Sequence, residues 1–364
     1  RVLSRTPPTP GNNLILSLDL GLQEAAEKAF GDRRGALVAL DPNNGEVLAF
    51  VSKPGYDNNL FIVGIDQENW NLLNNSIDRP LNNRALRGVY PPGSTFKPFM
   101  ALAALELGKR TPEYSMSDPG YFSLPGVDRR YRDWKPGGHG RVNLHKSLVV
   151  SCDTYYYSLA NDLGIDNIHS FIGQFGLGKK TGIDIEGEVS GLLPSSAWKM
   201  RQYNQKWYAG DTISVAIGQG YNLATPLQLA VATMIIANNG KVYFPHLVKQ
   251  IQNSQTGEIE NIPAKLLNTL NLKPQHLDIV KSALVDVTRP GGTAAKASIN
   301  AAYTFAGKTG TSQVIGIKQV ERYNDKSINE RHRDHAMFIA YAPAEDPKIA
   351  LAVLVENTGT GGST

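Results

Sequence analysis

Residues 90–97 read Tyr90-Pro91-Pro92-Gly93-Ser94-Thr95-Phe96-Lys97, and the other elements of the chain can be placed around this stretch. Prolines and a glycine precede helix-forming residues, so a helix is expected over Thr95–Leu107 with Ser94 at its start. Lys97 follows Ser94 by three residues, which puts both side chains on one helix face. A neighbouring lysine of lowered pKa can remove the serine proton, so the stretch predicts a nucleophile and its base. By itself, such a tetrad is more often an ordinary helix start.

Apolar runs on both sides of this stretch predict strands near the two ends of the chain. Gly35–Leu40 and Val47–Ser52 are joined by a turn that ends in Asn44-Gly45, a typical hairpin signal. Further strands are expected at Leu14–Leu18, Thr304–Thr309, Ala336–Ala342 and Ile349–Glu356. Between the two strand groups, further helices are expected at Leu144–Leu163, Ile168–Phe175, Pro226–Ala237 and Pro274–Thr288, and one precedes them at Leu20–Phe30.

These elements predict an α/β fold in which an antiparallel five-stranded sheet is flanked by helices and carries an inserted helical subdomain. The sheet is expected from residues 35–53 and 304–356, and the helical insert from about 60–300. Residues 1–13 contain three prolines and are interpreted as a linker from a missing N-terminal region, and residues 14–364 as the domain itself.

The overall composition describes a globular chain and excludes several classes of protein. Its 364 residues are 41% hydrophobic, enough to bury a sizeable core. A net charge of +4, from 37 basic and 33 acidic residues spread along the chain, is too small and dispersed to indicate a nucleic-acid partner. A single cysteine excludes an internal disulfide framework.

Two further motifs raise the significance of the Ser94 tetrad. Ser151-Cys152-Asp153 lies in the middle of the helical insert, and Lys308-Thr309-Gly310-Thr311 lies at the end of a predicted strand. Their order and their predicted settings match the three-part signature of penicillin-binding proteins and serine β-lactamases.

On these residues the chain resembles the class B penicillin-binding proteins, and in particular those of cell elongation. The second motif ends in Asp153, a variant that favours the elongation-specific members over the division-specific ones. The resemblance extends to separated stretches along nearly the whole chain: Gly138-His139-Gly140, residues 214–228, Ala237-Asn238-Asn239-Gly240 and Arg333-Asp334-His335-Ala336. It implies the transpeptidase fold outlined above, without the C-terminal helix that closes the sheet in the family.

The resemblance also implies how the site residues divide the chemistry. Ser94 would form the acyl-enzyme with Lys97 as its base, and Lys308 would bind a substrate carboxylate and keep Lys97 from holding its proton. Ser151 would relay a proton to the leaving amine, and Asp153 would orient Lys97 and a substrate amide. The residues that would hold the substrate carboxylate are Thr309, Gly310 and Thr311. The backbone N–H groups of Ser94 and Thr311 would form the oxyanion hole.

Several other residues have both a purely structural and a functional interpretation. Trp134 and Tyr221 sit beside loops and are candidates for the wall of a substrate groove. Tyr155, Tyr156 and Tyr157 are more simply explained as core. Gln219, between two glycines, is expected to pack near the site rather than to act in catalysis.

A zinc site is expected in the Pro- and Gly-rich stretch at residues 111–143, which lacks the apolar residues to hold itself. Cysteine and histidine together select zinc, and a closed structural site needs four ligands. The candidate ligands are Asp118, Asp133, His139 and Cys152, with Asp128 as a substitute for either aspartate. The alternative is purely structural: Cys152 is a small buried core residue and His139 a turn residue.

The resemblance implies peptidoglycan stem peptides as substrates and β-lactam antibiotics as inhibitors. It also implies a membrane glycan polymerase and rod-complex scaffold proteins as partners, and a location at the periplasmic face of the bacterial inner membrane with an N-terminal anchor. Two alternatives remain at this point. A serine β-lactamase would need a base for deacylation, and no second carboxylate stands in a recognisable setting. A non-catalytic β-lactam sensor would have lost Ser94, Lys97 or Lys308, and all three are present.

Overall fold

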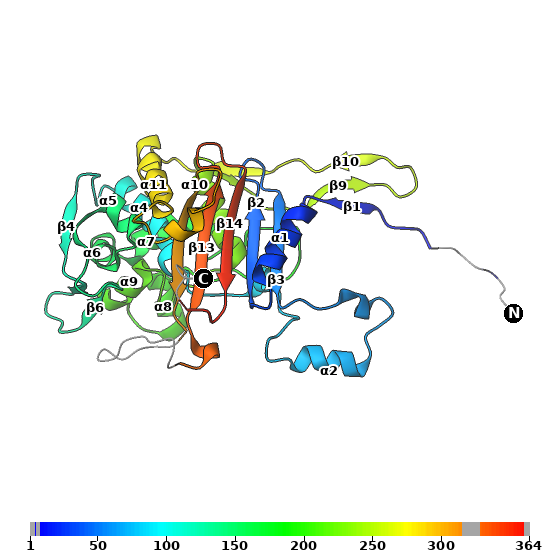
Figure 1. Cartoon of the computed structure of the whole chain (residues 1–364), viewed down its shortest axis with the longest axis horizontal. Helices are drawn as coiled ribbons and strands as arrows, with labels where there is room; N and C mark the ends of the chain where they lie inside the picture. The colour runs from blue at the N-terminus through cyan, green and yellow to red at the C-terminus, as the bar shows by residue number, and fades with distance from the viewer. Residues whose placement is uncertain (1–3, 5–7, 315–327, 360–364) are drawn as a thin grey trace.

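A five-stranded antiparallel sheet forms the centre of the molecule in the computed structural model, which describes residues 4, 8–314 and 328–359 (Figure 1). In spatial order the strands are β12 (Ala306–Ser312), β13 (His335–Ala342), β14 (Ile349–Val355), β2 (Gly35–Leu40) and β3 (Val47–Lys53). Strands from the two ends of the chain therefore share one sheet, as the sequence predicted. The predicted β12 began two residues and ended three residues too early, and the predicted β14 was one residue too long at its end.

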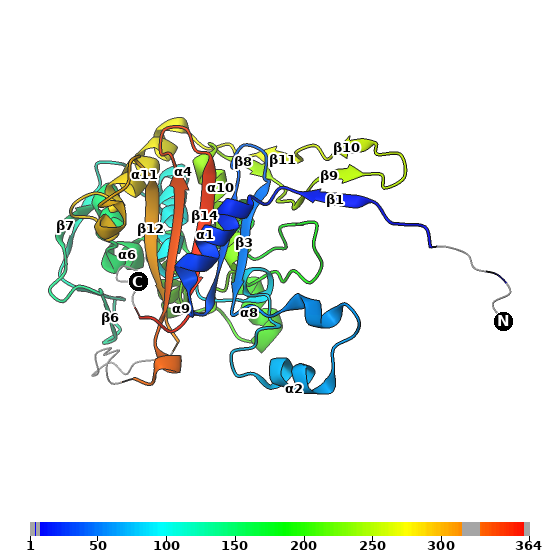
Figure 2. The ribbon, with the colours of Figure 1, turned by 45° about the vertical axis from the view of Figure 1, so that its right-hand side comes forward.

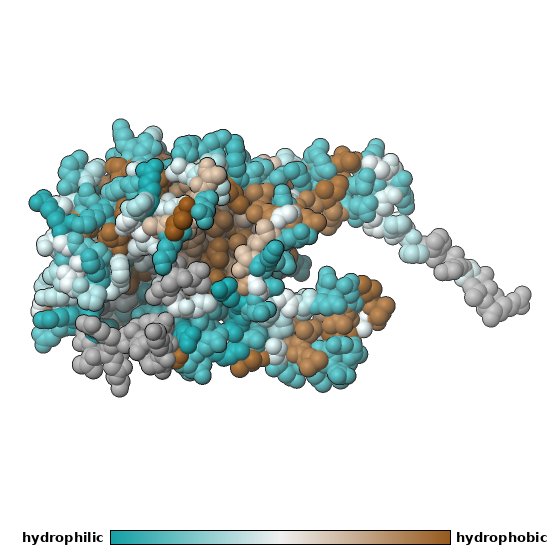
Figure 3. Space-filling view, in the orientation of Figure 1, coloured by the Kyte–Doolittle hydropathy of each residue, from teal (hydrophilic) through white to brown (hydrophobic). Residues whose placement is uncertain are grey.

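Hydrophobic alternation fixes how this sheet is covered. In β14 every second residue is buried, and Leu37 of β2 lies opposite Val353. One face packs against α10 (Pro226–Ala237), all of whose residues are buried, as expected for a helix that is apolar on every side. The other face carries α1 (Leu20–Phe30), as Figure 2 shows. Beside α1 this face is hollowed into an apolar pocket of about 470 Å³, lined in part by Phe30, Met337 and Val353 (Figure 3).

The helical insert lies at the β12 side of the sheet (Figure 1). Its helices, with those of the connecting segments, are α2 (Gln67–Asn75), α3 (Arg84–Arg87), α4 (Lys97–Glu106), α5 (Leu144–Val149), α6 (Asp153–Leu163), α7 (Ile165–Ile172), α8 (Ser196–Tyr203), α9 (Ala209–Ala216) and α11 (Pro274–Val287). Short 3-10 turns are η1 (Asn58–Phe61), η2 (Gly93–Phe96), η3 (Gly173–Phe175), η4 (Ala295–Ser298) and η6 (Glu330–His332). One continuous hydrophobic core joins α4, α6 and α10 to the inner face of the sheet.

Small strand pairs complete the fold. An arm consists of β1 (Asn13–Leu16), β9 (Val248–Gln252) and β10 (Ile259–Asn261), and β8 (Lys241–Tyr243) pairs with β11 (Leu266–Thr269). The Pro- and Gly-rich stretch contains two pairs: β4 (Ser115–Asp118) with β7 (Gly140–Asn143), and β5 (Tyr121–Ser123) with β6 (Arg130–Arg132). Within the described part of the chain, no helix is long and apolar enough to cross a membrane.

The single helix expected over 144–163 is wrong, because the chain breaks it into α5 and α6. Ser151 has a φ of 55°, a left-handed conformation that no helix continues through. The helix expected from Thr95 likewise begins as the tight turn η2, and α4 starts at Lys97. No local sequence pattern predicted these breaks, and both of them fall at the predicted catalytic motifs.

Candidate active site

Lys97 is the residue on which the predicted motifs converge. Its side chain is fully buried, and its Nζ donates to the carbonyl oxygen of Ser151 at 2.8 Å and to the Ser151 Oγ at 3.2 Å. The same Nζ lies 2.6 Å from Oδ1 of Asp153. A buried ammonium is stable only when paired and hydrogen-bonded, and these contacts satisfy it. Lys97 therefore ties the helix start that carries Ser94 to the break between α5 and α6.

Lys308 brings the third motif to the same point. It is fully buried on β12, and its Nζ donates to the Oγ of Ser151 at 2.9 Å. The Ser151 hydroxyl therefore lies between two lysine side chains. The structure thus brings the lysines of the first and third motifs together with both polar residues of the second, which is the geometry that proton exchange among them requires.

The electrostatics of the two lysines differ from the expected division of roles. Burial, reinforced by the charge of nearby Lys97, lowers the pKa of Lys308 well below that of an exposed lysine. Lys97 instead faces the carboxylate of Asp153 at ion-pair distance. Burial raises the pKa of Asp153, and the Lys97 ammonium opposes that rise. A ligand carboxylate beside Lys308 would restore the favourable charge balance of its ammonium form.

Asp153 has little capacity left for a substrate amide. Its Oδ1 is occupied by Lys97, and its Oδ2 accepts the backbone N–H of Trp134 at 3.2 Å. The expected contact with Lys97 is present in the structure. The second expected contact, to the substrate, would have to share an oxygen that Trp134 already uses.

Close approach of β12 to η2 shapes the expected oxyanion hole. Gly93 has a φ of 55°, and a Cβ built on it would lie 2.2 Å from the carbonyl oxygen of Thr311. A Cβ on Gly310 would lie 2.7 Å from Cγ2 of Thr95. Glycine at both positions therefore lets the backbone beside Ser94 touch the third motif.

Two residues that the sequence did not assign to catalysis hold β12 in place. Gln219 donates from Nε2 to the carbonyl oxygen of Thr311 at 2.8 Å, and this agrees with the packing role expected for it. Thr293 shares a 2.7 Å hydrogen bond with the hydroxyl of Thr309. Thr293 was missed because it comes from the connection after α11, and only the tertiary fold places it beside the motif.

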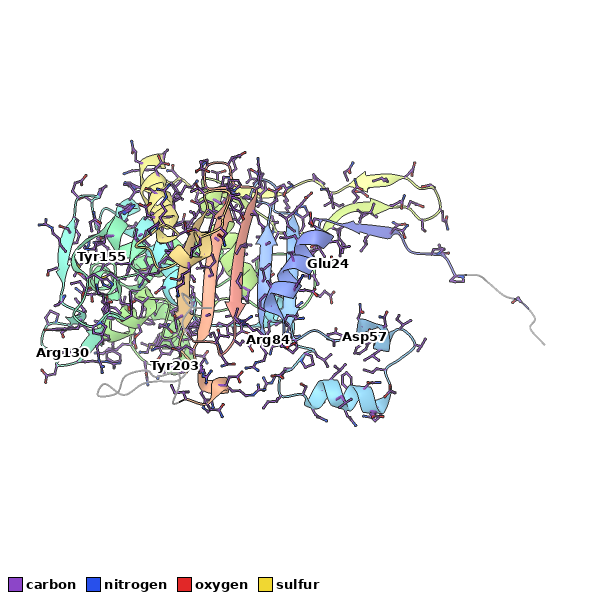
Figure 4. The ribbon with its side chains drawn as sticks, in the orientation of Figure 1. Glu24, Asp57, Arg84, Arg130, Tyr155 and Tyr203 are labelled. Carbon is purple, nitrogen blue, oxygen red and sulfur yellow. The ribbon has the colours of Figure 1, made fainter. Side chains whose placement is uncertain are left out.

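A charged network anchors the segment before Ser94, and no sequence motif predicted it. The Tyr90 hydroxyl donates to Glu356 at 2.7 Å, and Arg84 donates to the same carboxylate oxygen at 2.9 Å. Figure 4 shows Arg84 below the strands of the sheet. Glu356 directly follows β14, so the network couples the catalytic segment to the middle of the sheet.

Trp134 and Tyr221, the two candidates for the wall of a substrate groove, occupy different places. Trp134 lies directly at the second motif: its indole Nε1 donates to the carbonyl oxygen of Ser151 at 3.1 Å, and 58% of the residue is exposed. Tyr221 is half-buried and instead joins a group of aromatic rings from α8 and the turn that precedes α9. Trp134 therefore stands at the edge of the catalytic cluster, whereas Tyr221 belongs to a neighbouring surface.

The four candidate zinc ligands meet at one buried point. Their ligand atoms all lie within 4.8 Å of one another, and the four side chains are buried. The Nδ1 of His139 is 2.9 Å from Oδ2 of Asp118 and 3.5 Å from Oδ1 of Asp133, and the Cys152 Sγ is 3.4 Å from Asp118. Asp128, the expected substitute, is exposed and is not in this group.

The same aspartates also hold backbone around the second motif. Asp133 accepts the N–H groups of Asp153 and Thr154 at 2.7 and 3.1 Å, and so caps the first turn of α6. Asp118 accepts the N–H groups of Gly120 and His139 at 2.7 and 2.8 Å. Through Asp133 the cluster therefore supports the backbone of catalytic Asp153, directly after Cys152.

Comparison with known proteins agrees with this geometry. The family model described as "Penicillin binding protein transpeptidase domain" matches residues 35–364. The chain belongs to the penicillin-binding protein transpeptidase family. The predicted family and the predicted sheet fold are therefore confirmed.

Named relatives place the chain near class B penicillin-binding protein 2. It is 47% identical to the peptidoglycan D,D-transpeptidase MrdA of Acinetobacter baumannii, over 100% of this chain and 54% of that protein. The chain thus spans about half the length of this relative.

Solved structures give the same result. Penicillin-binding protein 2 of Pseudomonas aeruginosa, in complex with WCK 5153, is 46% identical with a TM-score of 0.86, over 99% of this chain and 74% of that one. Penicillin-binding protein 2 of Helicobacter pylori, in complex with MreC, is 35% identical with a TM-score of 0.85, over 96% of this chain and 61% of that one.

Proposed function

We propose that this chain is the catalytic domain of a peptidoglycan D,D-transpeptidase, which cross-links stem peptides through an acyl ester on Ser94 during cell elongation. The observation that carries the proposal is the buried contact of Lys97, Ser151, Asp153 and Lys308 beside the Ser94 turn. The relatives named for this activity support it.

In the proposed reaction, Ser94 Oγ attacks the carbonyl carbon of the D-Ala-D-Ala bond. The neutral amine form of Lys97 accepts its proton, which then passes through the Ser151 hydroxyl to the leaving amine, and D-alanine departs. The substrate carboxylate binds beside Lys308, Thr309 and Thr311. The N–H groups of Ser94 and Thr311 stabilise the tetrahedral oxyanion. An amine of a second stem peptide then attacks the ester, loses a proton to the same relay, and releases Ser94.

The mass of the intact protein after incubation with benzylpenicillin tests this proposal. We expect one stable adduct per chain, absent in Ser94→Ala and unchanged in Ser190→Ala, an exposed serine at another site. Rapid turnover of the antibiotic would instead identify a β-lactamase. Release of D-alanine from a pentapeptide distinguishes the enzyme from a non-catalytic sensor. Labelling that survives in Ser94→Ala would refute the nucleophile.

We also propose that Asp118, Asp133, His139 and Cys152 hold a structural zinc ion. A tetrahedral site with ligand distances of about 2.0–2.3 Å has edges of roughly 3.3–3.8 Å. Two of the three contacts in the cluster, at 3.5 and 3.4 Å, lie in that range, and the third is shorter at 2.9 Å. The Nε2 of His139 is buried without a hydrogen-bond partner among the described residues, so Nδ1 is the nitrogen that faces the carboxylates. The ion would offset the charges of two buried aspartates and fix the second motif.

Zinc content of untagged protein, measured by elemental mass spectrometry, tests this proposal. We expect about one ion per chain, a fall in melting temperature when a chelator is added, and loss of both properties in Cys152→Ala. Asp128→Asn is the matched control, because Asp128 is an exposed carboxylate outside the cluster. A parent protein without zinc would overturn the proposal.

Location and partners follow from the proposed substrate and from the resemblance. Peptidoglycan lies outside the cytoplasmic membrane, so we place the domain at the periplasmic face of the inner membrane. In this proposal an N-terminal anchor holds the domain at that membrane. A glycan polymerase and a scaffold protein are the proposed partners, and the Helicobacter complex with MreC supports the scaffold.

A further inference from the structure

Five aromatic side chains gather on one surface that the proposed chemistry does not use. They come from α8, the connection to α9 and the turn that follows α9, and we call them the aromatic platform: Trp198, Tyr203, Trp207, Tyr208 and Tyr221. Four of these rings are linked by centroid distances of 5.1 to 6.2 Å around Tyr221. Such spacing is typical of rings in contact, so the platform presents several ring faces at fixed positions.

The rings of the platform are partly exposed to solvent and lie over a buried ion pair. Tyr203 is 49% exposed and Tyr208 is 53% exposed, which is unusual for rings whose only role is to fill a core. Beneath them lies Lys199, which is buried and forms an ion pair with Asp211. Its Nζ sits 4.9 Å from the ring centre of Tyr208 and 5.6 Å from that of Tyr221. One buried cation therefore orients several rings at once.

The platform adjoins the catalytic cluster through short connections. Tyr221 follows Gln219 by two residues, and Gln219 donates to the third motif. A Cβ on Gly218 would lie 2.2 Å from the carbonyl oxygen of Gly93, so this turn also touches the nucleophile segment. Helix α9 packs against α6, which begins at Asp153. In Figure 4, Tyr203 lies just below the sheet strands and on the same side as the helical insert.

The chemistry of the platform fits a carbohydrate. A pyranose ring has a C–H face that stacks on an aromatic ring, and its hydroxyl and amide groups need polar partners at the edge. Tyrosine and tryptophan offer both an apolar face and a polar tip. Exposed Lys206 lies over Tyr208 with its Nζ 5.4 Å from the ring centre, and exposed Arg201 lies on α8. These side chains supply hydrogen-bond donors for the hydroxyl and amide oxygens of a saccharide.

We propose that the aromatic platform binds the glycan strand from which a stem peptide reaches the Ser94 site. This inference rests on the proposed function, because only a peptidoglycan substrate brings a sugar chain to this surface. The platform holds the strand while the peptide enters beside β12, which raises the local concentration of stem peptide. A small β-lactam has no sugar chain and gains nothing from the platform. Polymeric substrates and antibiotics therefore depend differently on these rings.

Binding of a fluorescent chitohexaose, a neutral β-1,4-linked N-acetylglucosamine oligomer, tests the inference directly. We expect saturable binding by the parent, weakened about tenfold in Tyr203→Ala/Tyr208→Ala as two stacking faces are lost. Tyr203→Phe/Tyr208→Phe keeps the ring faces and is expected to bind within about twofold of the parent. Tyr56→Ala, a partly exposed tyrosine next to Asp57 on the opposite side of the sheet, is the matched control (Figure 4).

Benzylpenicillin acylation is measured on the same variants, and it separates this inference from the proposed function. Unchanged acylation with weakened sugar binding supports the platform. Absence of chitohexaose binding in the parent, or equal binding by the alanine variant, overturns it. A loss of affinity for a sugar-free stem tripeptide, without any loss for chitohexaose, also overturns it and assigns the surface to peptide. If benzylpenicillin does not acylate the parent protein, the proposed function is refuted. Chitohexaose binding still tests the platform in that case.

Discussion

Lys97 performs two tasks in the proposed reaction, since it neutralises buried Asp153 and exchanges a proton with Ser94. Substitution by alanine would remove both, leaving an unpaired buried carboxylate that costs about 3–5 kcal/mol of stability. Arginine separates the tasks, because its guanidinium keeps the charge and does not act as a base. The informative variant is therefore Lys97→Arg.

We expect Lys97→Arg to lower the rate of penicillin acylation by about 2 to 4 orders of magnitude, the range of general-base contributions. Stopped-flow fluorescence with a labelled penicillin measures this rate. Lys199→Arg, at the buried lysine paired with Asp211, controls for the change of shape and is expected to acylate normally. If Lys97→Arg lowers the acylation rate by less than tenfold, another residue acts as the base.

Glu356 makes stability depend on pH. Burial alone would raise its pKa, but hydrogen bonds from Arg84 and Tyr90 outweigh burial and hold the pKa below that of an ordinary glutamate. A carboxyl whose pKa is depressed in the folded state contributes stability that is fully present above its unfolded pKa. That contribution is lost as the pH falls through the folded pKa.

We therefore expect the free energy of unfolding of the parent to fall more steeply on acidification below about pH 5 than that of Glu356→Gln. Urea unfolding at a series of pH values measures the difference. Glu260→Gln, at an exposed position on β10, should follow the parent curve. Parallel curves for parent and Glu356→Gln would show that the network adds no pH-dependent stability.

At the scale of elements, the contact of η2 with β12 decides whether the oxyanion hole forms. Gly93→Ala would place a methyl group against Thr311 and push the two segments apart. We expect acylation to slow by about 10²-fold or more, comparable to the loss of an oxyanion-hole donor. The same acylation assay measures it.

Gly108→Ala separates the effect of this contact from that of backbone strain. Gly108 also has a positive φ, 65°, but a Cβ there meets nothing within 4 Å. The control variant is expected to lose some stability and to acylate normally. If both variants acylate alike, the close approach at Gly93 is not needed for the reaction.

The sequence predicted elements well where one regular signal decides them. Helix α1 and strand β2 were placed with their observed bounds, because periodicity and flanking turn residues agree there. The missed elements are short: α8 and α9 span eight residues each, too few to show a clear helical periodicity in the sequence. The break at Ser151 was invisible because tertiary contacts from Lys97 and Trp134 hold it.

The residues of the candidate site likewise divide into those that the sequence predicted and those that it did not. The motif residues and the four-ligand cluster could be placed together from the sequence, because each motif carries a known chemical logic and a defined order. The supporting residues Thr293, Gln219 and Glu356 act through hydrogen bonds that join distant segments. No local pattern encodes such pairings, so only the fold could supply them.

For the whole molecule, the insert and the sheet share one hydrophobic core. We expect them to unfold together, and amide hydrogen exchange at rising denaturant concentration tests this for α4 and β13. Both elements are expected to lose protection at the same denaturant concentration. Exchange of α4 at clearly lower concentration than β13 would instead show that the insert is an independent folding unit.

The pairing of β2 with β14 also bears on how such a chain is made and delivered. Leu37 meets its partner Val353 only after nearly the whole domain has left the ribosome, so the nascent polypeptide cannot close its sheet early. A translocation channel passes unfolded polypeptide. For the proposed periplasmic location, late closure keeps the chain unfolded during export, and the sheet is completed only once β14 has left the translocation channel.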